Sequence, residues 1–179
     1  MQERVVITGM GTANPLGLNV AESWRNVTNG VSGVGPITLF DANGLQVQIA
    51  CEVKNFDPEQ FMEAREVRRR DRFEQLSTVA VNEALESSGM EITESNADRI
   101  GVIISSAIGG LKSLQDAIIT NHTEGPRRVS PFLIPMLMAN GAAGLAAIDH
   151  GFKGPCFSVA SACASAKVFA LYSSGFLYQ

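Results

Sequence analysis

One cysteine among small side chains is the strongest chemical signal in the sequence. Residues 157–166 read FSVASACASA, so Cys163 has only alanine and serine neighbours from position 160 to position 166. A thiolate is a good nucleophile, and a helix N-terminus favours it through the helix dipole and free N–H groups. A strand that turns sharply into a helix needs small neighbours and exposes the residue at the turn. The pattern predicts either a catalytic nucleophile, whose own N–H could stabilise an oxyanion, or a small buried cysteine in an alanine-rich helix.

The other cysteines and the histidines lack such a setting. Cys51 lies in a strand-like run and Cys156 follows a Gly-Pro turn, so we interpret both as structural. His122 and His150 fall at the ends of predicted helices, where histidines usually cap or face solvent. No Cys-x-x-Cys pair or zinc spacing is present, so we expect no metal, and an odd number of thiols favours a reducing compartment.

Two local groups of arginines stand out against a net charge of −4. Such groups are usually solvated, but in an acidic protein they can also dock an acidic partner. The overall charge gives no footprint for nucleic-acid binding. The two groups are Arg65, Arg68, Arg69 and Arg70, and then Arg127 and Arg128.

A glycine pair after the first apolar run invites a dinucleotide-binding interpretation. Gly9 and Gly11 fit the first two positions of G-x-G-x-x-G, but the third is Asn14 and Pro15 follows it. A tight turn explains the pair better than a cofactor-binding oxidoreductase does. We therefore expect no cofactor.

The elements that must position Cys163 alternate between apolar runs and helical periods, which predicts one α/β domain. No apolar run approaches the ~18 residues of a membrane span, and the N-terminus lacks the layout of a signal peptide. We expect strands over residues 5–9, 47–53, 100–104 and 157–160, and helices over 20–29, 72–88, 109–120 and 131–150, with a loop over 30–36 and a last helix opening at Cys163. Asn19 caps the first helix, Gly30 ends it, and Gly89 ends the second, whose Leu76, Val79, Ala80 and Ala84 share one face.

Taken together, these segments resemble the N-terminal half of the β-ketoacyl-[acyl-carrier-protein] synthases, especially the type II elongating enzyme. The match runs in the family's order and spacing from residue 4 to about residue 166. It consists of RVVITGMG (4–11), PLG (15–17), Trp24, GVSG (30–33), FD (40–41), RRRD (68–71), RIG (99–101), SSAIGG (105–110), GPRRVSPF (125–132), GP (154–155) and SACAS (161–165).

The resemblance implies a thiolase-like fold in α-β-α-β-α layers, a homodimer and a cytoplasmic location. It implies that Cys163 accepts an acyl chain from a carrier-protein thioester, and that the carbanion left when malonyl-carrier protein loses CO₂ then attacks that thioester. It places Ile108 at the acyl-pocket wall and Phe132 near the partner subunit, both as substrate-binding positions. The family's carrier-docking positions fall on Arg65, Arg68, Arg69, Arg127 and Arg128.

The family's remaining catalytic groups belong to a C-terminal half. Two histidines, a lysine and a glycine-rich loop are expected there, and neither His122 nor His150 stands in those motifs. Residues 1–179 are thus expected to be the N-terminal domain, truncated just after the nucleophile helix begins, with an exposed apolar face and no condensing activity alone. The alternatives are a non-catalytic relic or assembly partner of a ketosynthase, and a fragment of a polyketide ketosynthase.

Overall fold

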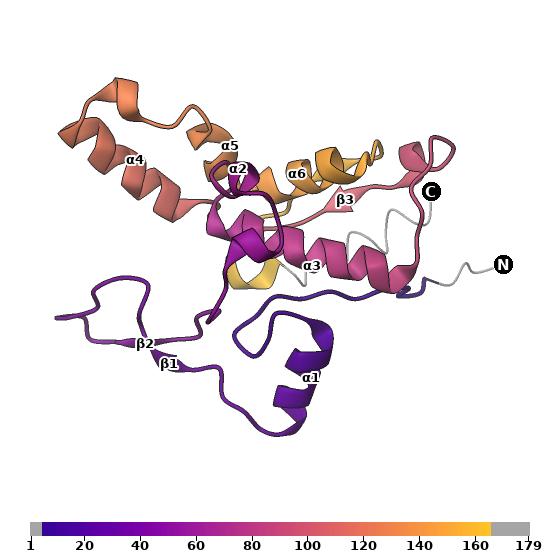
Figure 1. Cartoon of the computed structure of the whole chain (residues 1–179), viewed down its shortest axis with the longest axis horizontal. Helices are drawn as coiled ribbons and strands as arrows, with labels where there is room; N and C mark the ends of the chain where they lie inside the picture. Colours follow the sequence, from indigo (N-terminus) through magenta and orange to yellow (C-terminus); the bar gives the residue numbers. More distant parts are fainter. Residues whose placement is uncertain (1–4, 166–179) are drawn as a thin grey trace.

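The structure is a computed structural model, and it describes residues 5–165 (Figure 1). Helices dominate, and two small two-stranded sheets lie among them. The helices are α1 (Val20–Thr28), α2 (Ala64–Val67), α3 (Arg72–Ser88), α4 (Leu111–Thr123), α5 (Leu133–Leu137) and α6 (Gly141–His150). The strands are β1 (Gly35–Pro36), β2 (Ile49–Ala50), β3 (Val102–Ile103) and β4 (Cys156–Phe157).

Helix α3 is the central element, and its bounds confirm the predicted helix over residues 72–88. A capping box starts it: the Asp71 side chain accepts from the Phe73 N–H, and the Glu74 side chain accepts from the Asp71 N–H. Gly89 ends it in the left-handed conformation at φ 62°, as expected of a C-terminal glycine. Val79, on the predicted apolar face, is 5% exposed.

The predicted strand over residues 5–9 is wrong. This segment forms no strand with any described part of the chain, and Ile7 is 85% exposed. Its backbone instead approaches α3 so closely that a Cβ on Gly9 or Gly11 would collide with the carbonyl oxygens of Ala84 and Ala80. Gly9 and Gly11 therefore allow this backbone to pack directly against α3, because neither residue has a Cβ.

Glu83 of α3 forms hydrogen bonds with both the segment before α1 and the start of α1. Its carboxylate accepts from the Thr12 N–H at 2.9 Å and from the Val20 N–H at 2.8 Å. Asn19 caps α1 as predicted, by accepting from the Glu22 N–H, and the helix ends at Thr28, just before Gly30. One side chain on α3 therefore satisfies donors from two other segments.

Strands lie in three of the predicted strand regions, over 47–53, 100–104 and 157–160, but they are shorter than expected. β1 and β2 form an antiparallel pair, so the predicted strand over 47–53 lies in a hairpin whose partner falls within the predicted loop over 30–36. β3 and β4 are parallel, with Val102 opposite Cys156 and Ile103 opposite Phe157. The last strand therefore starts one residue before the predicted range over 157–160.

Helix α6 packs against this parallel pair and supplies much of the core. Ala143 and Ala146 are buried together with Val102 of β3, and Phe152 packs against this cluster. The alanines let the helix approach the strands closely, because a small side chain leaves little between the two backbones. The core beneath the end of β4 is thus built from small residues.

The predicted single helix over 131–150 is wrong, because α5 and α6 are separate helices. Met138 is extended at ψ 132° between them, and the chain bends where the loop before α4 crosses it. There the Gly110 N–H donates to the carbonyl oxygen of Leu137 at 3.2 Å, and Gly109 adopts φ 81°. The crossing backbone thus donates a hydrogen bond to the last carbonyl of α5. Helix α4 itself starts at Leu111, two residues later than predicted.

Candidate functional site

Cys163 lies in a sharp turn that follows β4. It is exposed and belongs to a short 3₁₀ turn over Ala162–Ala164. Ala162 adopts φ 46°, a left-handed conformation that alanine rarely takes. The sharp turn is therefore as predicted and the thiol is accessible, in contrast to the buried cysteine of the alternative interpretation. The helix expected to open at Cys163 extends outside the described residues.

The loop that carries Ile108 reaches the same edge of the parallel pair. β3 continues into residues 104–110 and β4 continues toward Cys163, and the carboxyl ends of parallel strands meet at one edge. The Ser105 hydroxyl accepts from the Val159 N–H at 3.2 Å, which joins the two segments directly. Ile108 is 65% exposed in this loop.

The predicted docking arginines divide into exposed and anchored residues. Arg65, Arg68, Arg127 and Arg128 are exposed, the last two in a 3₁₀ turn that also packs against α4. Arg69 is half-buried, with its guanidinium carbon 4.5 Å from the centroid of the Phe132 ring. The contact brings a predicted docking residue next to a predicted substrate residue.

Arg70, from the first arginine group, is a buried structural residue. It is 5% exposed and forms a bidentate pair with Asp149 of α6, at 2.7 and 2.9 Å. The same guanidinium also donates to Thr78 of α3 at 2.8 Å and to Glu66 of α2 at 3.3 Å. The hydrogen bond and the attraction to Asp149, together with Glu66, raise the pKa of Arg70 despite its burial.

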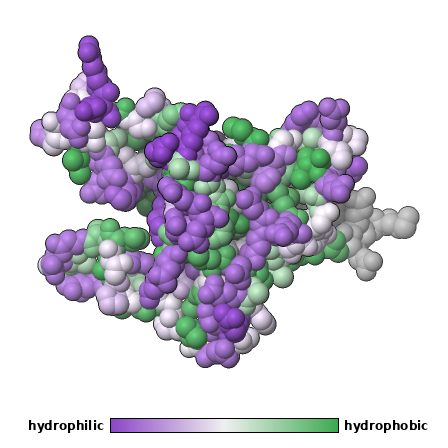
Figure 2. All heavy atoms as spheres, in the orientation of Figure 1, coloured by the Kyte–Doolittle hydropathy of each residue, from purple (hydrophilic) through white to green (hydrophobic). Residues whose placement is uncertain are grey.

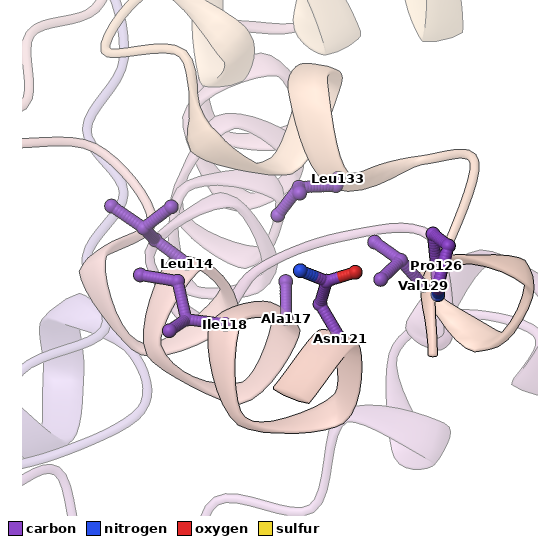
Figure 3. A pocket seen from close by; sticks show the side chains of 7 residues that line it. All are labelled: Leu114, Ala117, Ile118, Asn121, Pro126, Val129 and Leu133. Carbon is purple, nitrogen blue, oxygen red and sulfur yellow. The ribbon is translucent and has the colours of Figure 1, made fainter. Parts of the chain in front are cut away.

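An apolar groove of about 380 Å³ lies between α4 and the segment that joins it to α5 (Figure 3). Neither Ile108 nor Phe132 belongs to its lining. Asn121 supplies the only polar side chain among the lining residues, and its amide lies between the side chains of α4 and those of the facing segment. The lining consists of Leu114, Ala117, Ile118, Asn121, Pro126, Val129 and Leu133.

Sequence reasoning missed Glu74, the most buried large side chain among the described residues, at 1% exposure. Burial raises its pKa to about 7, and repulsion from Asp71 adds to this, while the bond from the Asp71 N–H and the charge of Arg70 oppose it. Its Oε1 has no hydrogen-bond partner in the described structure. The D-x-x-E capping pattern was visible in the sequence, but the burial was not.

The remaining candidates are isolated from one another. Cys51 and Cys156 are both exposed, and His150 stacks on Phe152 at the end of α6 while His122 lies in the last turn of α4. Within residues 5–165, no three histidine, cysteine or acidic side chains gather closely enough to hold a metal ion. No helix in the same range is long and apolar enough to cross a membrane.

Comparison with known proteins identifies the family. A family model described as "Beta-ketoacyl synthase, N-terminal domain" matches residues 2–174. The chain is 43% identical over 162 residues to the 3-oxoacyl-[acyl-carrier-protein] synthase 2 of Coxiella burnetii, covering 90% of this chain and 39% of that protein. The chain belongs to the β-ketoacyl synthase family, and it spans about 39% of the length of the curated relatives it matches.

Solved structures give the fold independently. The ishigamide ketosynthase/chain length factor aligns with a TM-score of 0.75 at 26% identity, over 89% of this chain and 40% of that one. A type II polyketide ketosynthase in complex with its acyl-carrier protein aligns with a TM-score of 0.69 at 23% identity, over 88% of this chain and 41% of that one. The described residues therefore form the N-terminal portion of a thiolase-like α/β fold, as predicted.

Proposed function

We propose that this chain supplies the acyl-accepting part of a 3-oxoacyl-[acyl-carrier-protein] synthase that elongates fatty acids, with Cys163 as the nucleophile. The observation that carries the proposal is the exposed thiol in a sharp turn after β4, in a chain of this family. Curated relatives at 43% and 45% identity are named 3-oxoacyl-[acyl-carrier-protein] synthase 2, which favours the fatty-acid pathway.

In the proposed reaction, the Cys163 thiolate attacks the carbonyl carbon of an acyl-carrier thioester. The electron pair of the C=O bond moves to oxygen, and the Cys163 N–H can donate to that oxyanion. The bond from the acyl carbon to the carrier sulfur then breaks, and the carrier thiol leaves with a proton from solvent. The acyl chain is now held as a thioester on Cys163.

The second half of the reaction consumes that thioester. Malonyl-carrier protein loses CO₂ as its C–C bond breaks, and the electron pair left on the α-carbon attacks the Cys163 thioester. The Cys163 thiolate leaves, and the product is a 3-oxoacyl-carrier protein longer by two carbons. No metal or organic cofactor is part of this proposal.

The other predicted residues take supporting roles. Ile108 lies in the loop fastened to the segment before Cys163, which supports its role at the acyl-pocket wall. For Phe132 we propose a place beside the acyl pocket at the interface of a homodimer. The exposed arginines suit an acidic carrier protein, and a structural neighbour forms such a complex. We further propose that the protein acts in the cytoplasm.

Acyl transfer to the chain tests the proposal. The purified chain is incubated with hexanoyl-carrier protein, and each cysteine peptide is weighed by mass spectrometry. We expect a hexanoyl group on Cys163 and none on Cys51 or Cys156. Cys163→Ala should abolish the adduct, whereas a Cys51→Ala, Cys156→Ala double variant should retain it. Equal labelling of the three cysteines, or none, contradicts the proposal.

A non-catalytic assembly partner is the second candidate, because one structural neighbour is a ketosynthase/chain length factor. An assembly partner needs the surface of the fold but not the thiol. The same acylation measurement separates the two candidates, since only the catalytic one requires selective transfer to Cys163.

A further inference from the structure

We propose that Ser165 is a positioning residue that aims the backbone N–H of Cys163 at the oxyanion. The proposal rests on the proposed function of Cys163. Ser165 is 7% exposed, and its hydroxyl makes two hydrogen bonds across the turn. Its Oγ accepts from the Ser161 N–H at 2.9 Å and donates to the Ala162 carbonyl oxygen at 2.8 Å.

The second bond fixes the peptide plane that contains the N–H of Cys163. The Ala162 carbonyl and the Cys163 N–H belong to the same peptide unit, which is planar and trans, so they point in opposite directions. The hydroxyl of Ser165 and the backbone N–H of Ser165 both donate to this carbonyl, so together they set the direction of the Cys163 N–H. Within residues 5–165 this N–H has no hydrogen-bond acceptor, so it is free to bind a developing negative charge.

The first bond explains how the turn keeps its conformation. Ala162 at φ 46° has its Cβ close to the following carbonyl, so without restraint this residue would return to a right-handed or extended conformation. The Ser165 Oγ binds the Ser161 N–H on one side of Ala162 and the Ala162 carbonyl on the other side, so it holds both ends of the strained residue. Removing that oxygen would leave the Ala162 carbonyl with only the backbone N–H of Ser165 and the Ser161 N–H without its acceptor, so the peptide before Cys163 could tilt away from its present direction.

The Ser165 position requires a short side chain with a hydroxyl group. A single short group must accept one hydrogen bond and donate another, which serine and threonine do and alanine cannot. Ser161 provides a matched control, because it takes part in these bonds through its backbone only. Ser161→Ala therefore removes a neighbouring hydroxyl and leaves both bonds of Ser165 in place.

Two reagents distinguish an aimed N–H from a general effect on the thiol. The hexanoyl thioester of N-acetylcysteamine reacts through an oxyanion and needs no carrier docking, whereas iodoacetamide alkylates by direct displacement without one. Rates of both reactions at Cys163 are measured by peptide mass spectrometry for the unaltered chain, Ser165→Ala, Ser165→Thr and Ser161→Ala. Cys51 and Cys156 in the same samples serve as internal references.

We expect Ser165→Ala to slow acylation of Cys163 by about tenfold or more, since loss of one oxyanion donor costs ~10²–10³ in rate. The rate of alkylation should change by less than about threefold, because direct displacement forms no oxyanion and needs no aimed N–H. Ser165→Thr should restore acylation, and Ser161→Ala should match the unaltered chain. Acylation of Ser165→Ala at the parent rate, or an equal slowing of both reactions, overturns the proposal.

Hydrogen exchange at the Ser161 amide gives a readout independent of acyl transfer. Ser165→Ala should accelerate this exchange and Ser165→Thr should not. Unchanged exchange in Ser165→Ala overturns the proposal whatever the thioester does. Absence of acylation at Cys163 in the unaltered chain, with the exchange effect intact, contradicts instead the proposed function and with it the positioning role of Ser165 in acyl transfer.

Discussion

Glu74 has the most strongly raised pKa among the carboxyl groups of the described residues. Its carboxyl lies beside Gly141, where a Cβ would collide with Oε1, so the glycine makes room for the acid. With a folded-state pKa of about 7, the group is largely protonated at mildly acidic pH. A neutral carboxyl at this position avoids placing an uncompensated charge between α3 and α6.

The pKa of Glu74 predicts a specific pH dependence of stability. Because the folded-state pKa is raised above the unfolded value of 4.5, the folded chain binds more protons between these values. The free energy of unfolding should therefore fall as pH rises from about 4.5 to about 7, and stay level above that. Glu74→Gln should remove this loss, gaining roughly 2–3 kcal/mol relative to the unaltered chain between pH 5 and pH 8.

Urea unfolding of both chains at pH 5 and pH 8 measures this difference. Other titrating groups affect the two chains alike and cancel in the comparison. An equal pH dependence in Glu74→Gln and the unaltered chain would show that Glu74 ionises normally in the folded state.

At this scale the sequence could indicate Cys163 but not Glu74. The small residues around Cys163 are contiguous in the chain, so their local pattern reveals the turn. The carboxyl of Glu74 lies against Gly141, which is distant in sequence, and no local pattern records that approach. Arg70 was likewise visible as an arginine, but its partner Asp149 was not.

At the scale of elements, the break between α5 and α6 depends on the loop that crosses it. The Gly109 backbone lies against the Leu137 carbonyl, where a Cβ has no room. The prediction of one helix over 131–150 failed because it gave the methionines and alanines of this segment more weight than Asn140 and Gly141, which lie at the break. The crossing segment lies at the same place and uses the Leu137 carbonyl that the break leaves accessible.

Two glycine substitutions test this account. Gly109→Ala should lower the free energy of unfolding by more than about 2 kcal/mol, because it adds both a collision and strain at φ 81°. Gly144→Ala lies inside α6, where nothing stands within 4 Å of the new Cβ, and should raise stability by ~0.5–1 kcal/mol. Chemical denaturation measures both, and similar effects of the two would refute the crossing-loop explanation.

The Arg70–Asp149 pair joins α2, α3 and α6 through one guanidinium. Asp149→Ala should cost about 3 kcal/mol or more in unfolding free energy, because it leaves a buried arginine without its main partner. Replacing both residues, as Arg70→Met with Asp149→Leu, should recover part of that loss. The exposed pair of Lys112 and Asp116 is the control, and Lys112→Ala should change stability by less than ~1 kcal/mol.

Urea denaturation of the unaltered chain and the three variants completes this comparison. If Asp149→Ala is no more destabilising than Lys112→Ala, then solvent must reach Arg70 and the buried pair does not bind the helices together.

At the scale of the whole molecule, the surface combines scattered apolar residues with hydrophilic ones (Figure 2). Trp24 is 69% exposed and Ile148 is 78% exposed. The α/β class and the order of most elements followed from the sequence. The first strand did not, because a strand exists only with a partner, and the N-terminal segment lies against α3 instead.

The proposed docking of a carrier protein involves exposed side chains from separate segments of this surface. Arg68→Ala and Arg127→Ala should each weaken binding of an acyl-carrier protein by about threefold, and their combination by about tenfold, because each removes one exposed cation facing an acidic partner. The loss should shrink as salt is raised, since exposed charges are screened. Arg25→Ala, on the exposed face of α1, should bind normally.

Fluorescence anisotropy with a labelled carrier protein at two ionic strengths measures these affinities. An equal loss in Arg25→Ala would point to general charge attraction, and unchanged binding in the double variant would place the docking surface elsewhere.

The parallel pairing of β3 with β4 also affects the stage of folding at which the turn at Cys163 can form. The two strands meet only after residues 104–155, with α4, α5 and α6, have been brought into place between them. Contacts between residues so distant in the chain form slowly, because a long loop must close first. We therefore expect the turn at Cys163 to be among the last parts to become ordered during folding, so that a chain still being assembled does not yet hold the proposed nucleophile in its final orientation.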